Sequence, residues 1–494
     1  MIALVLAAWL LAAGAAVADQ QGPADPPKAD KAKQPKEGKK AGKQAGGKKA
    51  KDPNKPKKNK AAKAAVPSPD EPLADDTETQ VVPVNDQPKP HFVWKQHPSL
   101  RFGKVLRIDF QAKFQEDYRS SYDNAEVLAE LDPWELHRSR IGVAGTLFKH
   151  IDFEVERELQ EKELSEKDVL LGLSPSPQWK DVNVNLDYVN NAQFQVGKFK
   201  IPFGLDTLTG VSHNDFVYRS LGATYLSPSR DVGAMVHGRF FKRGLNYWVG
   251  GFQHDGDNAR SKKIQGGDET FAARVTGLPL RRVNSDHFGA FEVGGAFTAS
   301  QVSDDSFRPN GVRGRTVVTQ DTFYESVYVK GKRFRYETDL DWTLGPASLR
   351  AEYTHVLDQR KNQSFSDEDL PDARYRSWYV SGTWILTGEE KTRPVKAGDD
   401  FLRGGFGAVE VAGRVERIWF DSVDKSDEPF ANPRAYTILP SDNKVVTVGI
   451  NWTLNRFTKL QFNVIREQVG NADRNPVPNG AAFWSRVFRL QLVL

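Results

Sequence analysis

The stretch LRIDFQAKFQ, residues 106–115, has apolar side chains at even positions and charged or amide side chains at odd positions. Successive side chains of a β-strand point to opposite faces, so such a strand has one apolar and one polar face. The same alternation recurs at residues 138–147, 335–342, 446–454 and 488–494. Polar loops such as residues 255–268 and 421–443 separate the alternating stretches. The pattern predicts an all-β chain.

A soluble β-sandwich would also alternate, so the solvent on the apolar face has to be inferred from other features. The opposite face carries charged side chains, which a water-filled lumen tolerates and a dry core does not. Tryptophans lie on the alternating strands and are expected to form outward-facing belts: Trp248, Trp342, Trp378, Trp384, Trp419, Trp452 and Trp484. Such rings favour the membrane interface. We therefore predict a transmembrane antiparallel β-barrel of about 16 strands.

The composition excludes several other classes of protein. The 494 residues include no cysteine, which excludes disulfide scaffolds, thiolate catalysis and cysteine zinc sites. The mean hydropathy of −0.56 and the 27% of charged residues exclude a bundle of membrane helices. We find no HExxH motif, P-loop or dinucleotide fingerprint. The expected protein is not an enzyme, and no catalytic residue, cofactor or metal site is predicted.

Three segments follow from the composition along the chain. Residues 1–18 are an apolar run ending in Ala16-Val17-Ala18 and are expected to be a signal peptide. Residues 19–95 are expected to be a disordered Lys/Ala/Pro-rich periplasmic linker, because they lack the apolar side chains that could offset chain entropy. Residues 96–494 are expected to form the barrel. The linker region holds 17 Lys and 11 acidic residues, so the overall excess of +5 belongs to the first 95 residues.

The lysines between residues 28 and 63 leave two interpretations open. The segment is either a solvated spacer or an electrostatic contact to an anionic cell-wall polymer. Nucleic acid is not an expected partner, because no aromatic residue is interleaved for base stacking.

Several motifs together resemble the phosphate-selective porin O and P family. They are QVGKFKIPFGL (195–205), YRS (218–220), PSRDVGAMVHG (228–238), SWYV (377–380), GAVEVAGR (407–414), GINW (449–452) and RLQL (489–492). The resemblance spans residues 100–494 and implies a trimeric, 16-stranded porin in the outer membrane of a Gram-negative-type (diderm) bacterium. It further implies passive diffusion of small anions such as phosphate, and contact with outer-membrane lipid and lipopolysaccharide.

An anion that enters a narrow pore sheds water, and Arg and Lys can replace that water with charge-assisted hydrogen bonds. The resemblance implies that residues 205–230 hold a loop that folds inward and narrows the pore. The candidate anion-binding residues are Lys198, Lys200, Arg219, Arg230, Arg239, Arg107 and Arg140. An alternative is that Arg219 and Arg230 pair with Asp215 and Asp231 and only hold the loop in shape.

Acidic residues argue against a strict anion filter. Asp152, Glu154, Glu156 and Glu158 alternate with apolar residues and are expected to share one face of a strand. A non-selective general porin therefore remains open, as does a barrel that mainly anchors the envelope through its Lys-rich segment. A secreted β-sandwich is the remaining alternative.

Overall fold

The computed structural model describes the chain from Pro90 to Leu494 with several gaps. The described residues are 90–94, 98–103, 105–122, 131–160, 178–241, 244–257, 269–281, 290–304, 309–470 and 481–494. The predictions for residues 1–18 and 28–63 lie outside them. Within the described residues, no helix has the length and apolar composition needed to cross a membrane.

Sixteen antiparallel strands close into a barrel, which confirms the predicted fold. They are β3 (Leu106–Tyr122), β4 (Trp134–Leu147), β5 (Ile151–Glu158), β6 (Trp179–Val189), β7 (Ala192–Lys200), β8 (Arg230–Phe240), β9 (Leu245–Phe252), β10 (Thr270–Gly277), β11 (Phe291–Val302), β14 (Gly331–Leu344), β15 (Ala347–Arg360), β16 (Leu370–Ile385), β17 (Ala408–Ser422), β18 (Ser441–Thr453), β19 (Thr458–Gly470) and β20 (Ala482–Val493). Each pairs with the next barrel strand, and β20 pairs back with β3. Closure matters because a lipid-facing sheet edge would leave backbone groups unpaired.

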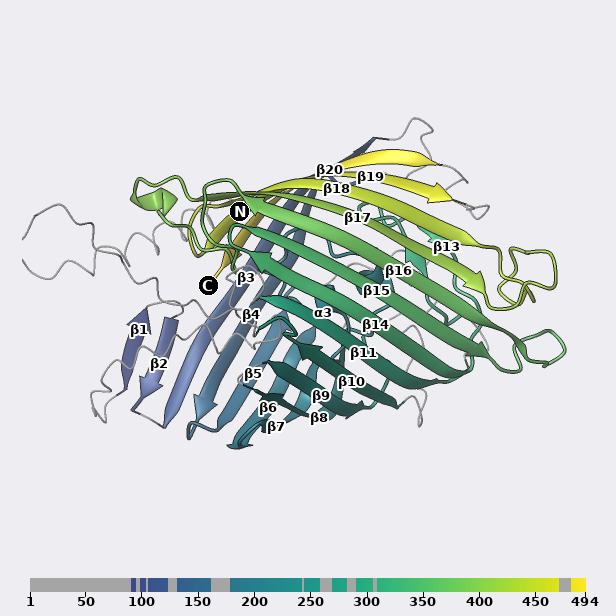
Figure 1. The fold of residues 1–494 in the computed structure, drawn as a ribbon, viewed down its shortest axis with the longest axis horizontal. Coiled ribbons are helices and arrows are strands. Elements are labelled where there is room, and N and C mark those ends of the chain that lie inside the picture. The colour runs from purple at the N-terminus through teal and green to yellow at the C-terminus, as the bar shows by residue number, and fades with distance from the viewer. Residues whose placement is uncertain are drawn as a thin grey trace, which may run out of the picture. The chain divides into compact units, whose positions relative to one another are not determined.

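The two ends of the barrel differ in the length of their connections (Figure 1). One end has short turns such as residues 148–150, 190–191 and 345–346, and it also holds the start of β3. We call it the short-turn end. The other end carries longer connections, such as residues 201–229 and 423–440, and is called the long-loop end.

The strands divide their side chains between lumen and exterior as the alternation predicts. On β3, Lys113 and Gln115 are buried inside the barrel, whereas Phe110 and Tyr118 are exposed on its outside. Trp248 was expected in an outward belt, and this prediction is wrong. Its register with Arg274 turns it inward, where it joins a buried apolar cluster. The exposed tryptophans on the outer surface include Trp378, Trp384 and Trp484.

A short hairpin precedes the barrel and pairs with its first strand. The strands β1 (His91–Trp94) and β2 (Pro98–Phe102) form this hairpin, and β2 pairs with the first residues of β3. In contrast, the register of β20 with β3 begins at Lys113, next to backbone hydrogen bonds between Ala112 and Leu494. Residues 91–94 of the expected disordered linker therefore form a strand, because the aromatic and apolar side chains of β1 favour extended backbone.

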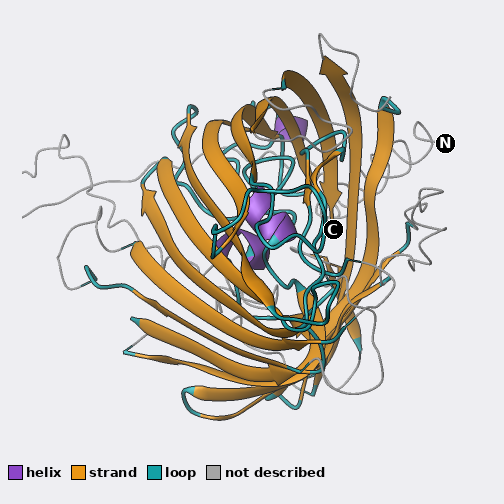
Figure 2. Ribbon diagram, turned by 90° about the vertical axis from the view of Figure 1, so that its right-hand side faces the viewer, coloured by secondary structure: helices purple, strands orange, loops and turns teal. Residues whose placement is uncertain are grey.

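Two connections from the long-loop end lie inside the ring of strands (Figure 2). The first, residues 201–229, contains α3 (Leu205–Leu208) and α4 (Leu221–Tyr225). The second, residues 303–330, contains the paired strands β12 (Gly314–Arg315) and β13 (Thr322–Tyr324). A 3-10 helix, η2 (Phe401–Arg403), lies in the connection from β16 to β17.

The second inward connection packs an apolar core against the barrel wall. The ring of Tyr324 stacks on that of Phe420 with 4.1 Å between centroids. Further buried wall residues of this core are Tyr375, Val445, Ile465, Phe483 and Val487. The inner wall of β16 to β20 is therefore largely apolar toward the long-loop end, with the buried Glu467 accepting a hydrogen bond from Val317 N of the second connection. Charged side chains were expected on the inner face of the strands. This prediction is wrong for β16 and β18, whose inward residues such as Tyr375 and Val445 are uncharged and meet a loop instead of water.

Candidate functional site

The connection 201–229, hereafter the inward loop, leaves the wall after β7 and returns at β8. Ile201 and Phe203 are fully buried, which draws the chain away from solvent as soon as the strand ends. Gly204 makes the turn with a φ of 82°, and a Cβ there would lie 2.9 Å from Ser227 Oγ. Only glycine accepts both conditions without strain. An inward loop thus lies where the resemblance implied one.

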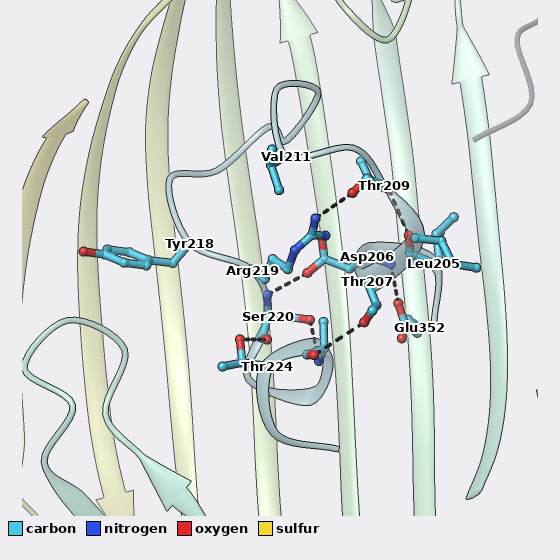
Figure 3. Close-up of polar contacts among 12 residues, drawn as sticks. Leu205, Asp206, Thr207, Thr209, Val211, Tyr218, Arg219, Ser220, Thr224 and Glu352 are labelled. Carbon is cyan, nitrogen blue, oxygen red and sulfur yellow. Dashed lines mark hydrogen bonds and ion pairs between the residues drawn. The ribbon is translucent and has the colours of Figure 1, made fainter. Parts of the chain in front are cut away.

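Side chains of the far wall hold the backbone of the inward loop. Three of them accept hydrogen bonds from loop amides: Glu352 from Asp206 at 2.9 Å, Glu416 from Leu221 at 2.6 Å and Asn463 from Val217 at 2.8 Å. Two arginines donate to loop carbonyls: Arg489 to Val217 at 2.7 Å and Arg414 to Tyr218 at 3.1 Å. Figure 3 shows the contact from Glu352. The loop is therefore fixed on both sides of the lumen.

The connection from β16 to β17 also reaches the inward loop, from the short-turn end. Its Lys391 has a fully buried ammonium group that pairs with Asp215 of the loop at 2.5 Å and with Glu410 of β17. Arg393 of the same connection lies 3.0 Å from Asp341 on β14. We did not predict these two cations from the sequence. They lie outside any alternating strand, and Asp215 is 176 residues away from Lys391 in the chain.

Positive charge converges on the tip of the inward loop. Lys459 donates to the carbonyls of Ser212 at 3.1 Å and Asn214 at 2.9 Å, on either side of His213. The pKa of His213 is lowered to about 3. Burial is the largest cause, and the positive charges of Lys459, Lys113, Lys200 and Arg393 follow. The environment of His213 therefore disfavours an added positive charge.

Two of the candidate residues, Arg219 and Arg230, are ion-paired, but with partners other than those considered from the sequence. Arg219 donates to Thr209 O at 2.6 Å and lies 3.6 Å from Asp206, inside the loop (Figure 3). Arg230 binds Asp181 of β6, with 2.8 Å between its Nη2 and Oδ2. The expected partners are wrong because the loop turns Asp215 toward Lys391, while Asp231 accepts from the backbone of His254.

Lys198 and Lys200 follow each other on β7 and differ in their surroundings. The register pairs Lys198 with the outward-facing Val182 and Val232, and its ammonium group binds Asp257 at 2.9 Å. Its expected place on the lumen side is therefore wrong. Lys200, at the end of the strand, donates to Leu208 O at 2.8 Å and so holds α3 of the inward loop.

The remaining candidates, Arg107, Arg140 and Arg239, lie on the inward face of the wall as predicted. Arg140 on β4 pairs with Glu156 at 2.8 Å and with Glu158 at 2.7 Å. Arg107 on β3 pairs with Asp109 at 2.8 Å and keeps 24% of its side chain exposed. Arg239 lies on β8 opposite Asn246, near the short-turn end.

The four acidic residues of β5 share one face, and their register with β4 turns that face inward. Glu156 is buried between Lys113 and Arg140, so its charge is compensated. Asp152 accepts from Thr146 at 2.8 Å. The row of carboxylates is therefore largely matched by donors on β3 and β4, and its repulsion of anions is weaker than the sequence suggested.

One group of residues could in principle hold a metal ion. Donor atoms of Asp117, Glu135 and His137 lie within 4.8 Å of one another. Asp117 already forms a bidentate pair with Arg489 at 2.6 and 2.7 Å, and Glu135 pairs with Arg119 at 2.7 Å. Two of the three donors are thus neutralised by guanidinium groups, and ion pairing explains the cluster.

Comparisons with known proteins give a family and a set of similar folds. A family model described as phosphate-selective porin O and P matches residues 108–493. No curated protein shows a significant match. Among solved structures, OmpT of Vibrio cholerae in a trimer form is 12% identical with a TM-score of 0.48, covering 79% of this chain and 100% of that one. The channel DcaP of Acinetobacter baumannii is 8% identical with a TM-score of 0.48, covering 79% and 98%.

Proposed function

The chain belongs to the phosphate-selective porin O and P family and forms an outer-membrane porin channel, and we propose that this channel favours small anions such as phosphate. The observation that supports the proposal is the cluster of cations near the tip of the inward loop. Lys459 donates to the carbonyls on either side of His213, and the charges of Lys113, Lys200 and Arg393 also act on His213. A positive environment at a constriction lowers the cost of partial dehydration for an anion.

Passage requires that the anion also leave, so binding has to be weak or spread over several sites. The lumen offers a series of cations that keep some exposure: 24% at Arg107, 17% at Arg138 and 19% at Arg219. Each of these guanidinium groups already forms an ion pair with a carboxylate. A passing oxyanion would have to replace these carboxylates as the acceptor of hydrogen bonds from the guanidinium N–H groups. This competition keeps each contact weak.

A non-selective general porin is the second candidate. It is favoured by the inward carboxylates of β14, since Glu337 and Asp339 share the single guanidinium of Arg274. If these charges dominated the solute path, cations would pass as readily as anions.

Ion selectivity in a planar bilayer separates the two candidates. We expect a reversal potential of anion-selective sign across a chloride gradient, and a current that falls when phosphate is added. Arg219→Gln should lower the anion-to-cation permeability ratio by about threefold, because it removes a partly exposed charge from the loop. The matched control is Arg157→Gln, which removes an exposed arginine from the outer face of β5. Cation-selective currents, or equal effects of both substitutions, would contradict the proposal.

We further propose that the channel is a homotrimer, as family membership suggests, and that the Lys-rich segment at residues 28–63 contacts an anionic cell-wall polymer. Mass measurement of the detergent-solubilised protein by light scattering tests the first point. A mass of one chain or two chains would contradict it.

A further inference from the structure

A band of cations encircles part of the outer surface at the long-loop end. Five successive strands contribute to it: Arg374 and Arg376 on β16, Arg417 on β17, Lys444 on β18, Arg466 on β19 and Arg486 on β20. These strands lie side by side along the barrel (Figure 1). The register places the six side chains on the same face as the exposed Trp378, Val446 and Trp484. We call them the outer basic band.

The outer basic band keeps an excess of positive charge. The carboxylates that share this face of the five strands are Asp372, Asp421 and Asp442, three against six cations. Asp421 is shared by Arg374 at 2.8 Å and Arg376 at 2.9 Å, and Asp442 pairs with Arg417 at 2.8 Å. Arg417 nevertheless keeps 40% of its side chain exposed. Internal pairing therefore accounts for only part of the charge.

Tryptophan rings hold several of these arginines against the barrel. Arg376 and Arg417 both lie over Trp419, at 4.9 and 5.2 Å from the ring centroid, and Arg466 lies 6.0 Å from Trp484. A guanidinium stacked in this way loses little entropy when its N–H edge binds a carboxylate or phosphate. Tryptophan also marks the depth of the lipid headgroups. The band is thus a preorganised row of donors at headgroup level.

The position of the outer basic band along the strands shows which leaflet of the membrane it contacts. In outer-membrane barrels, short turns face the periplasm and long loops face the cell surface. Further toward the membrane centre, three of these strands expose Val380, Val415 and Val448, as the hydrocarbon layer requires. The band therefore lies at the headgroups of the outer leaflet.

We propose that the outer basic band binds the phosphate groups of an outer-leaflet glycolipid of the lipopolysaccharide type. Phosphomonoesters match the bidentate geometry of arginine, and the glycolipid supplies them at the depth of the band. A second copy of the chain is a poorer occupant, because it would have to present matching carboxylates from an outer surface. Outer faces such as that of β8 to β10 carry Val236, Val249 and Phe271 instead. The proposal needs only the membrane placement and is independent of the anion selectivity of the lumen.

Binding of purified lipid A to the full-length protein in detergent tests the proposal. Native mass spectrometry should show bisphosphorylated lipid A bound to the wild type. The triple variant Arg417→Gln, Lys444→Gln, Arg466→Gln should bind it about a hundredfold more weakly, at about fivefold per charge. The matched control removes three outward cations outside the band with Arg157→Gln, Lys198→Gln and Lys332→Gln, and should stay within about threefold of wild type. Single-channel conductance of the triple variant should be unchanged, which shows that it has folded.

A second measurement uses the wild type alone and does not depend on folding of a variant. Lipid A without phosphate groups should bind at least tenfold more weakly than the bisphosphorylated form, and inorganic phosphate at millimolar concentration should not displace the lipid. Equal binding of the two lipids would overturn the proposal. So would displacement by free phosphate, or a triple variant that keeps the lipid but changes its oligomeric state, since the band would then bind free ions or a second copy.

Discussion

Gly204 shows how much of the channel depends on a single backbone conformation. Its φ of 82° strains any residue that has a Cβ, and a Cβ there would lie 2.9 Å from Ser227 Oγ. Gly204→Ala should cost about 1–3 kcal/mol in the folded state and displace the start of the inward loop. We expect a larger single-channel conductance, because the loop then fills less of the lumen.

The control for this substitution is Gly345→Ala in a short turn. Gly345 also has a positive φ, 57°, but a Cβ there meets nothing within 4 Å. The conductance of the Gly345→Ala variant should equal that of wild type. If both variants conduct like wild type, Gly204 does not set the position of the loop.

At the residue scale, the sequence predicts which face of the barrel wall a side chain lies on. It predicts less well which residue that side chain pairs with. Arg140 was expected on the inward face and lies there, because alternation is a local property of a strand. The partner of Lys391 could not be predicted, since Asp215 reaches it only after the inward loop has crossed the lumen. Ion pairs between distant segments depend on tertiary packing, which leaves no periodic signal in the chain.

At the scale of the element, the inward loop should respond to pH through His213. Its pKa is about 3 in the folded protein and 6.5 for an ordinary histidine, so the unfolded loop binds the proton more readily. The stabilising effect of a neutral His213 is therefore complete above pH 6.5 and declines as the pH falls toward 3. We expect larger current fluctuations at pH 4 than at pH 7, as the loop loosens.

His213→Gln isolates this effect from that of the carboxylates, because it removes the titrating group and keeps a polar side chain. The difference between pH 4 and pH 7 should shrink in the variant. An unchanged pH dependence would assign it to other groups, such as Asp206, whose pKa is also lowered in the folded loop.

At the same scale, the sequence could identify the strands and the position of the inward loop, but it could not reveal the second inward connection. Residues 300–315 are expected to be a polar loop, and the valines between residues 312 and 329 give no strand pattern of their own. Val317, Val318 and Val327 become a core only because an apolar stretch of wall faces them. Such complementarity is visible only after closure of the barrel.

At the scale of the whole molecule, the barrel and the Lys-rich segment should be separable. Deletion of residues 19–88 keeps every described strand, including β1. We expect conductance and ion selectivity within about 20% of wild type, because the lumen is built from later residues. Bilayer recordings of the two proteins check this.

The same deletion tests the proposed contact with the cell wall. Binding of the outer-membrane fraction to isolated wall polymer should fall in the deletion mutant, and the loss should be reproduced by high salt. Retained binding would contradict the contact while leaving the channel function untouched.

The hairpin of β1 and β2 has a mechanical consequence. Both β1 and β3 run away from the short-turn end, with β2 antiparallel between them. A pull on the chain before His91, directed into the periplasm, would act along the strand axes. Antiparallel hydrogen bonds lie across those axes, so the bonds of each pair would bear the load together instead of opening one after another. The hairpin is thus built to transmit tension from the N-terminal segment to the first strand of the barrel.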